Sequence, residues 1–147
     1  IAIKDSKIDI TSEKVTKDSA KKFTKFLKGG EFVCLYGEMG VGKTTFVKYF
    51  INEYQKINNL TQTEITSPTF SLLNEYQVKD IRIKHYDLFR INRKEDIDNL
   101  DIFEKDNKLI TLIEWPQLLT DTQNIKSIDL TFNYLNDLND RSVDIKV

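Results

Sequence analysis

The feature that most constrains this chain is a glycine-rich stretch, Gly37-Glu38-Met39-Gly40-Val41-Gly42-Lys43-Thr44. It fits the pattern G-x-x-x-x-G-K-[ST] at every fixed position, and that pattern forms a loop whose backbone N–H groups surround a phosphate. In such a loop Lys43 adds a positive charge, and the Thr44 hydroxyl is a ligand for Mg²⁺. Residues 31–36 are a short apolar run suited to a buried strand, and apolar residues recur at helical spacing after Lys43. The sequence therefore predicts a strand, a phosphate-binding loop and a helix, in that order.

Composition narrows the classes of protein to consider. With 147 residues, 39% of them apolar and 31% charged, the chain suits one globular domain, residues 1–147, with its own core. The 22 basic and 23 acidic residues include no dense Lys/Arg tract, which argues against strong direct binding to nucleic acid. No apolar run approaches the ~20 residues of a membrane span and no secretion signal opens the chain, so we expect a cytoplasmic protein. The single cysteine, Cys34, lies in the apolar run and is interpreted as a small buried hydrophobe.

The rest of the chain predicts alternating strands and helices. Residues 7–10 form a short first strand, and Ser12 caps a helix that ends at Gly29-Gly30. Two segments of alternating pattern, residues 70–78 and 81–87, predict a hairpin. The remaining elements that we expect are a helix at residues 94–100, an acidic surface loop at 101–107, a buried strand at 109–113 and a second hairpin at 128–147 with its turn around 136–141.

Two carboxylates follow predicted strands, and both are candidates for binding a metal. Asp87 ends the 81–87 segment, where a carboxylate near a phosphate loop typically holds Mg²⁺ and its waters. Glu114 directly follows the buried 109–113 run, a position from which an acid meets the metal or the attacking water. We predict that Lys43, Asp87 and Glu114 are catalytic and that Thr44, Asp87 and Glu114 bind the metal. Which acid lies closer to the metal stays open.

A hydroxyl-rich loop and the only histidine lie between these elements. The segment Thr66-Ser67-Pro68-Thr69-Phe70 is either the turn before a strand or a switch-like loop whose hydroxyls face the terminal phosphate and the metal, and spacing alone favours the turn. His85 lies two residues before Asp87. We predict a structural or positioning role for it, because phosphoryl transfer depends on charge placement and does not require a histidine base.

Taken together, four of these motifs resemble the TsaE family, the small ATPase of the bacterial machinery that installs threonylcarbamoyladenosine in tRNA. They are the phosphate loop with Thr44-Thr45-Phe46, the loop Ser67-Pro68-Thr69-Phe70, the segment His85-Tyr86-Asp87-Leu88-Phe89-Arg90, and Ile113-Glu114-Trp115-Pro116. Many families share the phosphate loop, whereas the other three together are specific. The sequence departs from the family pattern at Val41, Phe89 and Asp101, and none of these departures removes a phosphate or metal ligand.

The resemblance implies an α/β protein with a P-loop NTPase fold, in which helices flank a mainly parallel central sheet that antiparallel strands extend. It implies ATP and Mg²⁺ as cofactors and the TsaD and TsaB subunits as partners, with tRNA met only through that complex. The ATP site that it implies comprises Glu38, Met39, Gly40, Val41, Gly42, Lys43, Thr44, Thr45, Ser67, Thr69 and Trp115, with Glu13 at the adenine.

For the mechanism, we expect a Mg²⁺-dependent ATPase that is slow alone and is stimulated by its partners, whose complex it drives or resets. The chain has four arginines, Arg82, Arg90, Arg93 and Arg141, and their placement in the sequence gives no basic lid of the kind that closes over the donor phosphate in small kinases. The alternative is a small nucleoside or metabolite kinase, in which residues 58–70 bind the acceptor. A regulatory GTPase is disfavoured because no N-K-x-D motif is present, and the intact set of charged site residues disfavours a module that only binds nucleotide.

Overall fold

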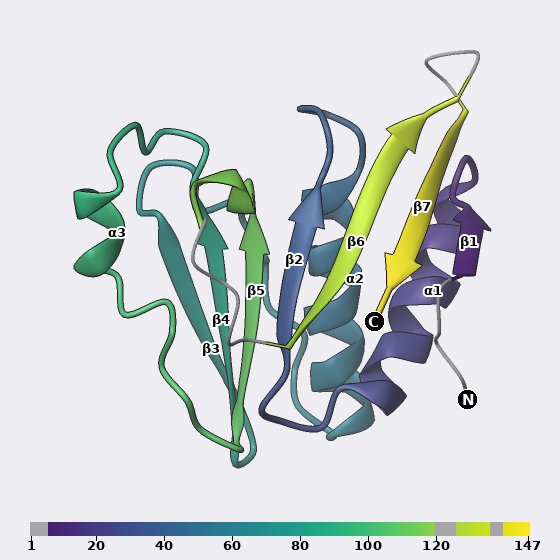
Figure 1. Ribbon diagram of the computed structural model, residues 1–147. Helices are drawn as coiled ribbons and strands as arrows, with labels where there is room; N and C mark the ends of the chain where they lie inside the picture. Colours follow the sequence, from purple (N-terminus) through teal and green to yellow (C-terminus); the bar gives the residue numbers. More distant parts are fainter. Residues whose placement is uncertain (1–5, 120–125, 136–139) are drawn as a thin grey trace.

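The computed structural model describes residues 6–119, 126–135 and 140–147. A seven-stranded sheet in the order β1-β7-β6-β2-β5-β4-β3 forms its centre (Figure 1). The strands are β1 (Ser6–Asp9), β2 (Phe32–Tyr36), β3 (Leu73–Val78), β4 (Ile81–Asp87), β5 (Leu109–Glu114), β6 (Ser127–Tyr134) and β7 (Arg141–Lys146). The helices are α1 (Glu13–Phe26), α2 (Lys43–Ile57), α3 (Glu95–Asp98) and a 3-10 turn at Pro116–Leu118. No helix of the described part is long and apolar enough to cross a bilayer.

The sheet is parallel at its centre and antiparallel at its edges. Strand β2 pairs in parallel with β5 and β6, and β4 pairs in parallel with β5. Strands β1, β7 and β3 are added by antiparallel pairing. This confirms the predicted architecture, with antiparallel pairings as numerous as parallel ones. The parallel strands β2, β4 and β5 end at the same edge of the sheet, at the top of Figure 1, where the site residues lie.

Both faces of the central strands are covered, which explains why β2 is a continuous apolar run. On one face, Val33 and Leu35 pack in the larger core beneath α1 and α2, which lie behind the sheet in Figure 1. On the other face, Phe32 and Cys34 join a second core with Ile113 and with Ile97 of α3. Burial raises the pKa of the Cys34 thiol to about 12, consistent with the small buried hydrophobe predicted from the sequence.

Most predicted elements are found with shifted ends. Ser12 has the extended backbone of a helix N-cap, but its side chain makes no capping hydrogen bond, contrary to prediction. Strand β3 begins at Leu73 rather than at residue 70, because residues 69–71 form a turn that is followed by a bend at Leu72, with φ 67°. The predicted 94–100 helix is only the short α3. Both strands of the second hairpin are present, and residues 136–139 of its predicted turn lie outside the described residues.

The acidic segment at residues 101–107 is predicted to be solvated surface; Asp106 is exposed as predicted, whereas Glu104 is only partly exposed and both acids pair with basic residues of β4. Glu104 accepts hydrogen bonds from Arg82 and from the buried Lys84, the latter at 2.7 Å. The Asp106 carboxylate lies 3.6 Å from the Arg82 guanidinium. Hydrogen bonds from Lys84 and Arg82 lower the pKa of Glu104. These ion pairs hold the loop against β4.

Gly29 follows the first helix and has φ 128°. Its surroundings predict how a substitution would change the stability of the protein. A Cβ at Gly29 would lie 2.2 Å from the backbone oxygen of Asn107, an atom that cannot swing away as a side chain does. We expect Gly29→Ala to lower the free energy of unfolding by about 3 kcal/mol, measured by urea denaturation. Gly30→Ala is the matched control, because its nearest neighbour would be 3.7 Å away and only backbone strain of about 1 kcal/mol remains. Equal losses in the two variants would contradict the role of the close approach.

Candidate nucleotide-binding site

The glycine loop lies between the end of β2 and the start of α2. Gly42 has φ 118°, in the left-handed region that favours glycine, and this conformation lets α2 begin directly at Lys43. A helix N-terminus carries unpaired N–H groups and a partial positive charge, so it attracts phosphate. The predicted order of strand, loop and helix is therefore found, with the helix starting at the motif lysine.

Lys43 lies in the centre of the site and is largely buried. Its Nζ donates to the Gly37 carbonyl and lies 3.6 Å from the centre of the Trp115 ring. Burial lowers the pKa of Lys43, while the carboxylates of Glu114 and Asp87 act in the opposite direction. A carbonyl and an aromatic ring are weaker partners for an ammonium than a phosphate group is.

Glu114 ends β5 and is 2% exposed. The Thr44 hydroxyl donates to this carboxylate, at 2.9 Å from Oε1 and 3.1 Å from Oε2. Glu114 Oε2 also lies 2.6 Å from Nε2 of the buried His85. The structure thus places the predicted hydroxyl ligand, the predicted acid and the lone histidine in one chain of contacts.

Asp87 ends β4 and is the register partner of Glu114 across the parallel β4–β5 pair. Its Oδ2 lies 3.4 Å from the hydroxyls of both Ser67 and Thr69, which are 2.8 Å from each other. Its Oδ1 accepts the backbone N–H of Phe89 at 3.0 Å. The hydroxyl-rich loop therefore forms a turn before β3, as spacing favoured, and also presents its hydroxyls to the predicted metal-binding acid.

Trp115 follows Glu114 and has φ 59°, in the left-handed region. A bulky residue in that conformation costs about 1–3 kcal/mol, and such strain tends to occur at functional sites. Its ring lies against Lys43 and is 4.8 Å from the ring of Phe89, centre to centre. Phe89, which departs from the family pattern, was not among the predicted site residues but lines the site.

These groups surround a cavity of about 300 Å³. Its lining consists of Met39, Gly40, Gly42, Lys43, Thr44, Thr45, Ser67, Thr69, Asp87, Phe89, Glu114 and Trp115. Three of the predicted ATP-site residues do not line this cavity, although two of them, Glu38 and Val41, are part of the glycine loop. Val41 is buried in the core, and its backbone N–H donates to the carbonyl of the exposed Glu38. The Glu13 carboxylate accepts a hydrogen bond from Tyr49 on α2.

The donor set of the cavity fits a hard cation. Its candidate ligands are the carboxylates of Asp87 and Glu114 and the hydroxyls of Thr44, Ser67 and Thr69, all oxygen atoms. Among the described residues no group of three or more His, Cys, Asp or Glu could hold a metal ion. Mg²⁺ beside phosphates usually needs only one or two carboxylates, with phosphate and water oxygens completing its shell.

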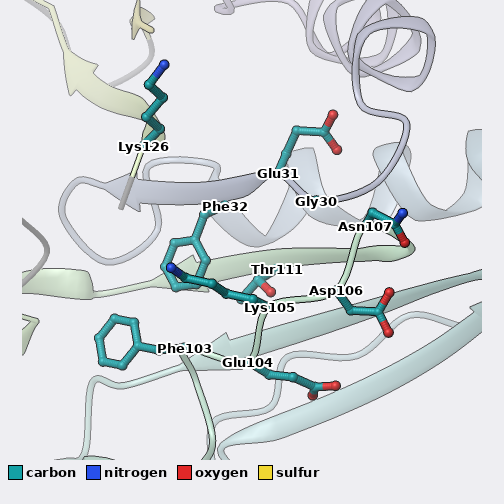
Figure 2. A pocket seen from close by; sticks show the side chains of 10 residues that line it. All are labelled: Gly30, Glu31, Phe32, Phe103, Glu104, Lys105, Asp106, Asn107, Thr111 and Lys126. Carbon is teal, nitrogen blue, oxygen red and sulfur yellow. The ribbon is translucent and has the colours of Figure 1, made fainter. Parts of the chain in front are cut away.

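A second cavity, of about 350 Å³, lies toward the opposite end of β2 (Figure 2). It is lined by Gly30, Glu31, Phe32, Phe103, Glu104, Lys105, Asp106, Asn107, Thr111 and Lys126, none of them a predicted site residue. Its acids already have partners: Glu31 accepts the backbone N–H groups of Lys28 and Gly29, and Glu104 pairs with Lys84. The glycine-loop cavity is therefore the one that gathers the predicted chemistry.

The fold and this site define a P-loop nucleotide-binding protein of the NTPase fold. Over residues 10–143 the chain also matches the family described as "Threonylcarbamoyl adenosine biosynthesis protein TsaE". The chain belongs to the TsaE family, and the resemblance inferred from the four motifs is confirmed.

Similar proteins agree with this assignment. The tRNA threonylcarbamoyladenosine biosynthesis protein TsaE of Rickettsia typhi is 40% identical over 110 residues, which are 75% of this chain and 74% of that protein. The protein of the same description from Aquifex aeolicus is 35% identical over 108 residues, 74% of each chain. The crystal structure of Bacillus subtilis YdiB is similar with a TM-score of 0.73 and 25% identity, covering 97% of this chain and 84% of that one.

Proposed function

We propose that this protein binds and hydrolyses ATP with Mg²⁺ within the machinery that makes threonylcarbamoyladenosine in tRNA, and that its ATPase cycle drives or resets a complex of TsaD and TsaB. Family membership supports the tRNA-modification part. The observation that carries the ATPase part is that Lys43, Thr44, Asp87 and Glu114 line one cavity. Contact with tRNA is through the complex.

The placement of each group supports the role that we propose for it. The loop N–H groups and Lys43 bind the phosphates, and Thr44 with the two acids holds Mg²⁺, which when bound neutralises charge that develops on the phosphates. Both acids are held on two sides, and the hydroxyls on Asp87 lie 3.4 Å away. The side-chain contacts of Glu114 are the shorter ones, at 2.9 Å from Thr44 and 2.6 Å from His85. Such a fixed carboxylate suits the orientation of an attacking water.

The surroundings of three of the four arginines support slow hydrolysis by the chain alone. Arg82 pairs with Glu104, Arg90 stacks over the Phe70 ring and Arg93 pairs with Asp96. None of them lines the glycine-loop cavity within the described part of the chain. The fourth, Arg141, lies beside Gly42 of the glycine loop but is not among the residues that line its cavity. A missing arginine finger costs roughly 10³ to 10⁵ in the rate of phosphoryl transfer, so a partner is expected to complete the site.

The test is ATP hydrolysis by this protein alone and after addition of purified TsaD and TsaB. We expect slow turnover alone and a rise of about 10³-fold or more with both partners, because they supply the missing stabilisation. GTP in place of ATP is the control for base preference. Fast turnover without partners, or no rise with them, would count against the proposal. ATP consumption that depends on an added small molecule would instead support the kinase alternative.

A further inference from the structure

The only histidine of the chain, His85, is completely buried, with 0% exposure. Its neighbours along the same face of β4 are the apolar Ile83 and the site residue Asp87. Burying an imidazole costs free energy unless its nitrogens are hydrogen-bonded. One nitrogen, Nε2, lies 2.6 Å from Glu114 Oε2, and the other, Nδ1, has no hydrogen-bond partner among the described residues. Within the described part of the chain, the contact with Glu114 is therefore the one polar interaction that accounts for a histidine at this position.

The direction of this hydrogen bond follows from the chemistry of the two groups. A carboxylate only accepts hydrogen bonds, so the hydrogen must be on Nε2 of His85. A hydrogen on Nδ1 instead would be a buried donor without an acceptor, which is the costlier arrangement. The geometry thus assigns Nε2 as the donor and Glu114 as the acceptor.

His85 lies within the central sheet, so its side chain holds the Glu114 carboxylate from a fixed position. His85 is the register partner of Leu112, two residues before Glu114 on the adjacent parallel strand. Thr44 holds the same carboxylate from the start of α2, so Glu114 is fixed from a strand and from a helix. A carboxylate with both sides held keeps one orientation, and a misplacement of about 1 Å at a reacting group can cost roughly 10²-fold in rate.

We propose that His85 is a positioning residue that fixes the orientation of Glu114 for ATP hydrolysis, an inference that rests on the function proposed above. His85 does not contact the phosphates, since it does not line the cavity. It acts through Glu114, so its loss lowers kcat and leaves ATP affinity nearly unchanged.

Two amide variants separate positioning from a purely structural role. In His85→Gln the amide nitrogen extends about as far as Nε2, whereas in His85→Asn it ends near the level of Nδ1 and does not reach Glu114. We expect His85→Asn to lower kcat roughly 10- to 100-fold, as loss of an orienting partner typically does, and His85→Gln to retain most of the wild-type value. ATP affinity can be measured from the fluorescence of Trp115, which is the only tryptophan of the chain. We expect this affinity to stay constant in both variants. Equal losses in the two variants, or no loss in either, would overturn the inference.

A second measurement is independent of activity, and its wild-type arm does not depend on the folding of any variant. Because the chain has one histidine, ¹⁵N NMR of untagged, nucleotide-free protein reports on His85 alone. We expect the hydrogen on Nε2 and a changed Nε2 resonance in Glu114→Gln. A hydrogen on Nδ1 alone would overturn the inference. If the wild-type protein hydrolysed no ATP under any condition, the proposed function would fail, while this measurement would still decide whether His85 holds Glu114.

Discussion

Replacing Lys43 with alanine should lower ATP affinity by about 10²- to 10³-fold and abolish measurable hydrolysis. At an effective dielectric constant of about 20, an ammonium roughly 4 Å from one phosphate charge contributes about 4 kcal/mol before desolvation, which corresponds to nearly 10³ in affinity. The ammonium is already largely desolvated, since it lies between the Gly37 carbonyl and the Trp115 ring. The fold has therefore already removed much of the water around this charge. A bound phosphate then interacts with the ammonium more strongly than it would with a fully hydrated lysine.

Affinity is best measured by calorimetry, because Lys43→Ala also changes the surroundings of Trp115. Lys48→Ala is the matched control, since Lys48 is an exposed lysine on the same helix outside the cavity. Its ATP affinity should equal that of the wild type within about twofold, as expected for a screened surface charge. Wild-type affinity in Lys43→Ala would rule out a phosphate-binding role for this residue.

The parts of the site that are encoded locally could be predicted from the sequence. The glycine loop needs only its own residues and the two flanking elements, and Glu114 is identified by the apolar run that precedes it. Asp87 and Glu114 were predicted separately, and the structure brings them together because β4 and β5 pair in parallel and in register. The carboxyl ends of neighbouring parallel strands share one edge of the sheet, so this proximity follows once the strand order is known.

Features that depend on side-chain direction could not be predicted. The contact of the Phe89 ring with Trp115 occurs beside a left-handed backbone at Trp115, for which neither an aromatic residue nor the following proline gives a local signal. The pairing of Glu104 with Lys84 joins a surface loop to a strand, and charge alone does not say whether an acid faces solvent or a buried lysine. The contact of Glu13 with Tyr49 likewise depends on how α1 packs against α2. Each case is a tertiary contact that sequence spacing does not encode.

The second large effect is expected at Glu114, where Glu114→Gln should retain ATP binding and lose turnover by about 10³-fold or more. Glutamine has nearly the same shape but lacks the charge, and it presents an NH₂ group where the carboxylate accepts hydrogen bonds from Thr44 and His85. The attacking water then loses its fixed carboxylate, whereas the glycine loop and Lys43 still bind the phosphates.

Binding and turnover are measured separately, by calorimetry and by phosphate release with TsaD and TsaB present. Glu64→Gln removes the same charge from an exposed position outside the cavity and should leave both quantities unchanged. Wild-type turnover in Glu114→Gln would exclude Glu114 as the group that serves the attacking water and shift that role to Asp87, the other acid of the cavity. Loss of binding together with turnover would instead mean that Glu114 serves mainly to hold the nucleotide and its cation. The ratio of the two losses therefore decides between these roles, because a group that acts only in the transition state changes kcat without changing ground-state affinity.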